Sequence, residues 1–432
     1  MGPAARPGLI LASVAVVQFM VSVDLSVVNL GLPQIAVGLG FTATGLTWVI
    51  HAYALTFGGL LLLGGKLADR YGIRRVLLCG LILFGLASLA GGFALEPWHL
   101  VAARALQGIG AAEASPAALA LLAVTFPAGR ERVRAYGIWS AMNAAGGALG
   151  VLIGGVLTEY ASWRWVMFVS VPMAAVALVL AWRGVAAVPP AAPSGRPDVA
   201  GGILATAGMT LLVFGIVRTD QYGWTSAMTL TTLATAVTLL AAFVHVERST
   251  TSDPLFRLGL LADRSVAGAN AYNLLLGGSL AASFYFGSLY LQGILGDRPT
   301  VAGLELLPFA LGVTAGAAIT IKLGNRVKPR TLLIAGGLMT AIGFTWFGSI
   351  SADGSYLTDV LGPSLVTSVG FGLCLGPVVS TATVGVAPHE AGAASGLLAS
   401  SRQIGGSLGL AALGTAAAER TGGRMTPEGL TE

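Results

Sequence analysis

Three ionisable residues lie inside long apolar segments of the sequence. Asp24 lies fifteen residues after Leu9 in the segment 9–31, and Arg104 and Glu113 lie in the segment 98–126. An ionised side chain at the centre of a bilayer costs about 2.5–3.5 kcal/mol on insertion scales, so such a residue is expected to face a protein interior or a wet cavity. A carboxyl group held there can take up and release a proton, because burial penalises its charged form.

Asp24 and Arg104 support the first hypothesis about chemistry. Asp24 is expected to accept a proton from outside and release it inside, and a cationic or polar substrate that competes for its charge would make the process an exchange. Arg104 does not deprotonate in proteins, so it needs a partner, and Asp24 is the candidate. Breaking and re-forming this ion pair would couple the protonation of Asp24 to the conformation of the protein. Two alternatives stay open. Asp24 can be a structural acid that is bonded to neighbouring backbone or hydroxyl groups, and the pair with Arg104 can be a static bond between two helices.

Glu113 is a second candidate for proton coupling or substrate binding. It lies nine residues after Arg104, which is about 180° around an ideal helix. Both side chains can face one cavity only if Gly108, Gly110 or Pro116 distorts the helix. The alternative is a buried acid bonded to a neighbouring helix.

Other polar residues in the apolar segments are candidates for lining a substrate cavity. Gln107 lies one turn after Arg104 and shares its helix face. The remaining candidates are Asn29, Asn270, Asn273, Arg402 and Gln403. For Arg402 and Gln403 the competing interpretation is packing across a helix bundle, and for the asparagines it is an ordinary position near the membrane interface.

The composition indicates that these residues lie in a membrane protein. Of the 432 residues, 55% are hydrophobic and 10% are charged, and the mean hydropathy is +0.80. Soluble domains carry about 25% charged residues. The 61 glycines lie inside apolar runs, where small residues allow membrane helices to approach closely. The sequence therefore predicts an all-α polytopic membrane protein.

Thirteen segments are long enough to cross a bilayer, which takes about 20 mostly apolar residues. They are 9–31, 44–65, 76–95, 98–126, 134–157, 164–186, 199–217, 227–246, 266–292, 300–321, 331–350, 358–386 and 391–417. With a cytoplasmic N-terminus, seventeen Lys and Arg residues fall inside and five outside, as the positive-inside rule requires. We therefore expect a multi-pass protein of the cell (inner or plasma) membrane, and no further span is visible after residue 417.

The segments group into two bundles with an insertion between them. Residues 1–186 are expected to form a six-helix bundle, and 266–432 a second bundle with five visible spans. Between them, 187–265 holds two extra spans and a proline-rich linker at 189–197.

A short repeat supports the division into two halves. The stretches 66–74 and 322–330 follow equivalent spans, and their lysine, leucine and both arginines coincide. Duplicated halves with substrate held between them at mid-membrane are typical of secondary transporters.

Two clusters outside the ionisable pair also predict function. The first is a loop cluster that comprises Gly65, Asp69, Arg70, Gly72, Arg74 and Arg75. Its carboxylate can cap a helix, and its arginines can pair with acids across the boundary between the two bundles. The alternative is that these charges only determine the orientation of the protein in the membrane. The second is a glycine cluster that permits close helix contact; it comprises Gly146, Gly150, Gly154 and Gly155.

Several function classes are excluded by the same sequence. No basic face with interleaved aromatic residues is present for nucleic acid, and no phosphate-binding loop or zinc-protease motif occurs. Cys79 and Cys374 lie far apart in apolar segments without metal-ligand spacing. We therefore expect no enzyme activity, no cofactor, no metal site and no nucleic-acid partner.

The motifs together resemble a known family. The stretch 65–75 resembles the cytoplasmic loop signature of the major facilitator superfamily, and Arg104, Gln107, Gly108 and Gly110 resemble its fourth-helix motif. The glycine cluster resembles the fifth-helix antiporter motif, with Val151 where proline is usual. The stretches 24–33, 163–172 and 394–406 resemble those of fourteen-helix drug:proton antiporters. The resemblance covers nearly the whole chain.

The resemblance implies a function and a mechanism. It implies a monomeric transporter that exports a small molecule in exchange for protons by alternating access. In the family, the 65–75 loop latches the two bundles in the outward-facing state, and the glycine-rich helix resists leakage between them. The main alternative is a proton symporter that imports a nutrient, because both use the same fold.

Overall fold

The computed structural model describes residues 6–126, 130–186, 199–249, 258–323, 326–350, 354–383 and 391–420. The linker predicted at 189–197 and the tail beyond Arg420 lie outside these residues, as does the side chain of Asp69. The described residues form helices and the turns between them, without a β-strand.

Long helices form over the predicted apolar segments. The helices are α1 (Pro7–Leu39), α2 (Ala43–Leu46), α3 (Trp48–Tyr71), α4 (Ile73–Gly92), α5 (Pro97–Thr125), α6 (Arg130–Tyr160), α7 (Arg164–Phe168), α8 (Ser170–Gly184), α9 (Val199–Val217), α10 (Thr219–Tyr222), α11 (Ala227–Ser249), α12 (Arg264–Leu289), α13 (Pro299–Leu323), α14 (Pro329–Phe347), α15 (Leu361–Thr383) and α16 (Ala391–Arg420), with short helical turns η1 (Leu258–Ala262), η2 (Tyr290–Ile294) and η3 (Tyr356–Val360).

Proline and glycine mark several helix boundaries. Pro7, Pro97 and Pro329 open their helices, where the missing N–H costs nothing and the fixed φ suits the first turn. Gly40 ends α1 at φ 69°, a left-handed conformation that favours glycine. Gly72 separates α3 from α4 at φ 94°, so this position of the predicted loop signature is required by backbone geometry.

The membrane prediction is confirmed. Among the described residues, twelve helices are long and apolar enough to cross a membrane, and they cover the first twelve predicted segments. α16 covers the thirteenth and is 30 residues long. Its Arg402 and Gln403 stand among glycines and serines, which lowers its hydropathy.

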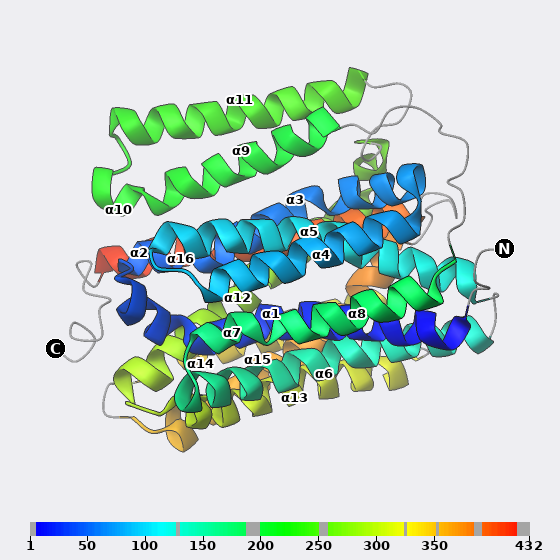
Figure 1. Ribbon diagram of the computed structural model, residues 1–432. Helices are drawn as coiled ribbons and strands as arrows, with labels where there is room; N and C mark the ends of the chain where they lie inside the picture. The colour runs from blue at the N-terminus through cyan, green and yellow to red at the C-terminus, as the bar shows by residue number, and fades with distance from the viewer. Residues whose placement is uncertain are drawn as a thin grey trace.

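The long helices run side by side in two bundles (Figure 1). In the first half, α1 packs against α5, α6 and α8, and α5 also packs against α3 and α4. In the second half, α12 packs against α16, and α15 packs against both α13 and α14. Each half therefore has one helix, α1 or α15, that packs against several others.

The helices α9 and α11 form a hairpin at one edge of the molecule (Figure 1). α9 packs against α3 of the first half and α16 of the second, whereas α11 packs against α9. Gly208 and Gly215 of α9 lie against Leu240 and Leu233 of α11. The hairpin therefore contacts both halves mainly through α9, and the short turn α10 adds a contact with α16.

The two halves are bonded to each other near the C-terminal end of α1. The Ser288 hydroxyl donates to the Asn29 carbonyl oxygen at 2.7 Å, and Gln292 Nε2 donates to the Leu30 carbonyl oxygen at 3.1 Å. Gln34 Nε2 donates to Gln292 Oε1 at 2.9 Å. The predicted orientation places these bonds toward the outer face of the membrane.

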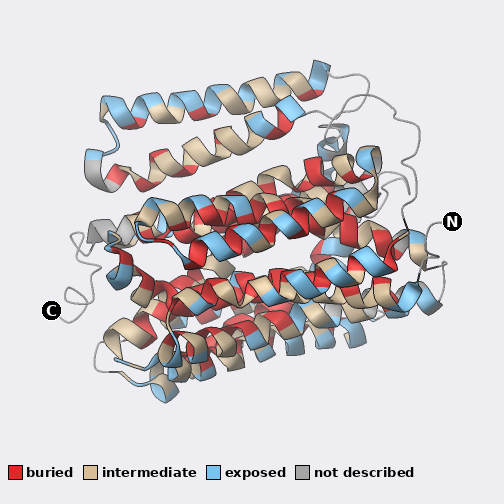
Figure 2. Ribbon diagram, in the orientation of Figure 1, coloured by how far each residue is buried: buried red, intermediate tan, exposed pale blue. Residues whose placement is uncertain are grey.

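Burial follows the bundle arrangement (Figure 2). Buried residues concentrate on the faces that helices turn toward each other, and large apolar residues such as Ile321, 80% exposed, and Leu357, 73% exposed, lie on the outside. A water-soluble protein rarely exposes so much apolar surface, whereas a bilayer accommodates it.

Candidate functional site

Asp24 and Arg104 form a fully buried ion pair in the first half. Arg104 Nη1 donates to Asp24 Oδ2 at 2.7 Å, and the two residues are 2% and 0% exposed. Asp24 lies on α1 and Arg104 on α5. The structure therefore brings together the two residues that the sequence analysis paired.

Neighbouring groups satisfy the rest of the pair. Arg104 Nε donates to the Val49 carbonyl oxygen at 3.0 Å, and its guanidinium carbon lies 4.4 Å from the centre of the Tyr53 ring. Arg104 Nη1 also donates to Gln107 Oε1 at 2.9 Å. Each charge-assisted bond of this kind is stronger than a neutral one.

Gln107 completes the cluster on the carboxylate side. Its Nε2 donates to Asp24 Oδ1 at 3.1 Å and to the Ser88 hydroxyl. The Ser170 hydroxyl lies 3.4 Å from Asp24 Oδ1. With Val49 and Tyr53, these residues come from α1, α3, α4, α5 and α8, so the cluster joins five helices of one half.

This buried ion-pair cluster can change state when Asp24 is protonated. A neutral carboxyl group no longer attracts the guanidinium, and an unpaired buried cation is strongly unfavourable. The Arg104 side chain would then need another partner. Protonation of Asp24 would therefore change the bonds that hold these helices together.

A second polar cluster, which the sequence analysis missed, lies nearer the start of α1. Gln18 Nε2 and the Ser22 hydroxyl both donate to Asn143 Oδ1 at 2.7 Å. Asn143 belongs to α6 and is exposed. Gln18, Ser22 and Ser26 recur every four residues, one helical turn apart, and this spacing was the available signal.

The asparagines that were predicted to line a cavity are buried and donate hydrogen bonds to backbone carbonyl oxygens. Asn29 and Asn270 are buried and donate to carbonyl oxygens of their own helices, Leu25 and Val266. Asn273 donates across to the Leu398 carbonyl oxygen of α16 at 2.6 Å. Gln107 is buried in the ion-pair cluster. Contact of these four residues with a substrate stays a prediction.

Arg402 and Gln403 lie side by side on α16 but in different surroundings. Gln403 is half-buried against Gly58 of α3, so it packs at the seam between the two halves. Arg402 is exposed, although its backbone is packed against Gly277 of α12. Of the predicted cavity residues, Arg402 alone is exposed in the structure.

Glu113 does not join the ion-pair cluster. It is half-buried, with its Cβ beside Gly80 of α4 and its Cα beside Gly64 of α3. Pro116 follows in α5, which nevertheless continues as one helix to Thr125. Glu113 therefore lies on another side of α5 from Arg104, and its role as a second group for proton coupling or substrate binding stays a prediction.

Two arginines of the loop cluster make contacts within the first half. Arg74 Nη2 donates to the Trp182 carbonyl oxygen of α8 at 3.0 Å. The Arg70 guanidinium lies 5.7 Å from the centre of the Tyr71 ring. The Arg74 bond ties α4 to α8 in the same bundle, so it does not form the predicted contact across the seam.

The glycine cluster divides between two partners. Gly146, Gly150 and Gly154 lie against α1, where added methyl groups would overlap Ser22, Ser26 and Val27. Gly155 instead lies against Pro299 and Thr300 of α13. The prediction that these glycines form a contact between bundles therefore applies to Gly155, whereas the other three pack within the first half.

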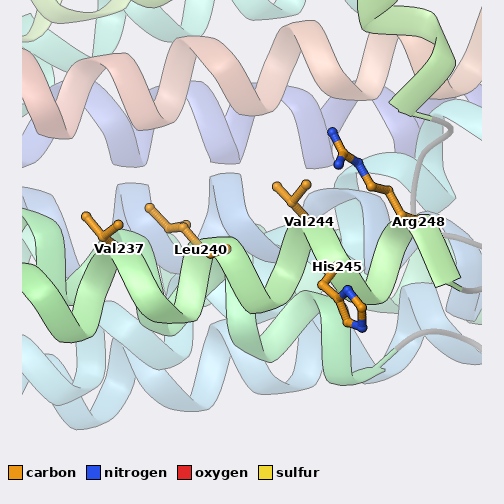
Figure 3. A pocket seen from close by; sticks show the side chains of 6 residues that line it. Val237, Leu240, Val244, His245 and Arg248 are labelled. Carbon is orange, nitrogen blue, oxygen red and sulfur yellow. The ribbon is translucent and has the colours of Figure 1, made fainter.

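A shallow groove runs along α11, away from both polar clusters. Figure 3 shows Val237, Leu240, Val244 and Arg248 extending to one side of the helix and His245 to the other. The lining is mostly apolar and comes from a single helix of the hairpin. It has no connection to the ion-pair cluster.

Comparison with known proteins identifies the fold and the relatives. Solved structures with the same fold include a bacterial homologue of the human lysosomal transporter Spinster, inward-facing and unoccupied, with a TM-score of 0.65 and 17% identity over 98% of this chain and 85% of that one. Another is the peptide transporter POT in complex with sulfate, with a TM-score of 0.66 and 17% identity over 98% of this chain and 92% of that one.

Closer relatives are found by sequence. The cephamycin export protein of Amycolatopsis lactamdurans is 43% identical over 97% of this chain and 86% of its own length. The puromycin resistance protein of Streptomyces alboniger is 39% identical over 99% and 85%. The model of the Major Facilitator Superfamily matches residues 14–410. This chain, with its two helical bundles and buried ion pair, therefore belongs to the Major Facilitator Superfamily, a family of membrane transporters and not of enzymes.

Proposed function

We propose that this protein exports small molecules, such as antibiotics or toxic metabolites, in exchange for protons by alternating access. The observation that supports it most is the buried ion pair of Asp24 and Arg104. A carboxylate in this position can exist in two protonation states, each of which favours a different arrangement of its helices. The sequence relatives named for cephamycin export and puromycin resistance favour export over import.

The cycle follows from the state of Asp24. In the conformation described here, Asp24 is bonded to Arg104 and the halves are bonded to each other near the C-terminal end of α1. A proton arriving from outside would neutralise Asp24 and free Arg104, and proton release inside would restore the pair. A ligand can shift such an equilibrium only by binding the two states unequally, so substrate and proton must favour opposite states.

The second candidate is a symporter, which moves solute and protons in the same direction. Nothing in the buried ion pair distinguishes the two directions, because the same protonation cycle serves both. The export names of the relatives are the reason to prefer antiport. One chain holds both halves, so we propose a monomer as the working unit, in the cell membrane with its N-terminus in the cytoplasm.

The test is substrate-dependent proton movement in proteoliposomes with puromycin as the probe. We expect Asp24→Asn to abolish uphill puromycin transport and the proton movement that accompanies it. Glu96→Gln is the control, because Glu96 lies in an exposed turn before α5. Proton movement that is unchanged in Asp24→Asn would contradict the proposal, and puromycin moving in the same direction as protons would establish symport.

A further inference from the structure

Arg402 is an exposed cation on α16. It lies about a third of the way along this helix. Its side chain is exposed, whereas the following Gly405, Gly406 and Ser407 are buried. A charged residue at such a depth faces a water-filled space or a partner.

The neighbours of Arg402 along α16 show that it faces the interior. With 100° per residue, Ala399 and Gly406 lie on the same side of the helix as Arg402. Ala399 packs against the buried core of the first half, and Gly406 lies beside Ala281 of α12. Ala411, half a turn from Arg402 in projection, packs with residues of α9 instead. Arg402 therefore points toward the space between the halves and away from the hairpin.

Arg402 has no counter-charge within the part of the chain that the structure describes. The ion pairs there are Arg104–Asp24 and Arg298–Glu159, and Asp24 is already bonded to Arg104 and Gln107. The described acids of the second half lie at or near helix ends; they are Asp263, Asp297, Glu305 and Asp359. Arg402 is therefore a positive charge that no side chain of the described residues neutralises.

The first half offers an exposed neutral hydrogen-bond donor. Asn143 Oδ1 accepts from both Gln18 and Ser22, so the amide NH₂ of this exposed residue is oriented away from those two donors. Gln18 lies about a third of the way along α1, as Arg402 does along α16. Both halves thus have polar donors at a similar distance from the start of these helices.

We propose that Arg402 is the anion-binding residue of the substrate site, and that the preferred substrates are small organic molecules carrying a carboxylate. The inference rests on the proposed transport function and specifies its substrate class. A guanidinium binds a carboxylate through two parallel N–H···O bonds. The bound carboxylate neutralises Arg402, and Asn143 donates to a second polar group of the same molecule.

The experiment compares three probes in proteoliposomes and in detergent. The probes are a cephalosporin with a free carboxylate, its methyl ester, and the organic cation ethidium. Binding is measured by quenching of tryptophan fluorescence, and transport by probe efflux driven by a proton gradient. The variants are Arg402→Gln and Arg402→Lys, with Arg330→Gln as the control because Arg330 is an exposed cation at the start of α14.

We expect Arg402→Gln to weaken carboxylate binding about ten- to a hundredfold, the range for a hydrogen bond to a charged group. Binding of the ester and of ethidium should change less than twofold. Arg402→Lys should retain part of the preference, because it keeps the charge but loses the planar fork. Arg330→Gln should behave as wild type.

Two results would overturn the inference. One is wild-type protein that binds the carboxylate and its ester equally, or binds neither. The other is an equal loss of binding of all three probes in Arg402→Gln. That result would indicate that Arg402 only stabilises the position of α16. Puromycin-driven proton movement in the wild-type protein separates this inference from the proposed function: if it is present while the wild-type protein binds the carboxylate and its ester equally, only the inference fails.

Discussion

The two halves of the transporter treat a membrane-embedded charge in opposite ways. In the first half, Asp24 and Arg104 neutralise each other and are bonded by side chains from five helices. In the second half, Arg402 is exposed and has no ion pair among the described residues. Under the proposed function, this difference corresponds to a division of labour, in which the first half would hold a proton-sensitive switch and the second half would present charge to a substrate.

We expect the largest loss of stability when one member of the buried ion pair is replaced and the other remains charged. Arg104→Met should destabilise the protein by about 3–5 kcal/mol, because it leaves Asp24 buried without a counter-charge. Arg402→Met should change stability by less than about 1 kcal/mol, because that side chain is exposed. Thermal unfolding in detergent measures both.

A double variant controls for this comparison. Asp24→Asn combined with Arg104→Gln removes both charges together and should recover much of the stability lost in Arg104→Met. Equal destabilisation by Arg104→Met and Arg402→Met would contradict the contrast between the halves.

A smaller effect is expected where the halves are alike, at their glycine contacts. Gly150 lies against Ser26 of α1, and Gly405 lies against the Leu274 backbone of α12. Alanine at either position should cost about 1–3 kcal/mol through overpacking. Thermal unfolding again provides the measurement.

Gly147 is the matched control for the glycine contacts. Its added methyl group meets nothing within 4 Å, so Gly147→Ala should be neutral or slightly stabilising because alanine favours a helix. A loss at Gly147 as large as that at Gly150 would show that helix packing is not the cause.

The smallest effect is expected at the neutral polar cluster. Asn143→Ala removes the acceptor shared by Gln18 and Ser22 and one donor of the proposed site, so KM for the cephalosporin carboxylate should rise about two- to tenfold. Thr235→Ala is the control, because Thr235 bonds only its own helix on exposed α11. If the two variants have the same KM, Asn143 has no part in binding.

Charged residues were easier to predict from the sequence than neutral ones. Asp24 and Arg104 stand out because an isolated charge in an apolar segment needs a partner, and the structure supplies that partner. Gln18 and Asn143 escaped notice because neutral amides are common in membrane helices and their meeting depends on how α1 packs against α6. The half-turn between Arg104 and Glu113 follows from helix geometry, and it holds in the structure.

Partners across the molecule could not be predicted from spacing alone. The glycine run of α6 indicates close contact, but its four members divide between α1 and α13 because they lie on different faces of one helix. Likewise, the loop signature predicts a contact across the seam, whereas Arg74 bonds within its own half. Such choices depend on tertiary packing, which a single sequence does not record.

The position of α9 has a consequence for how the halves rearrange. α9 contacts α3 and α16 at once, so any rocking of one half relative to the other must make α9 slide over at least one of these two helices. At the α3–α9 boundary, Gly59 of α3 lies against Thr206 of α9, and Gly202 of α9 lies against Leu63 of α3. α11 packs against α9, so we expect α11 to move together with α9 within the surrounding lipid.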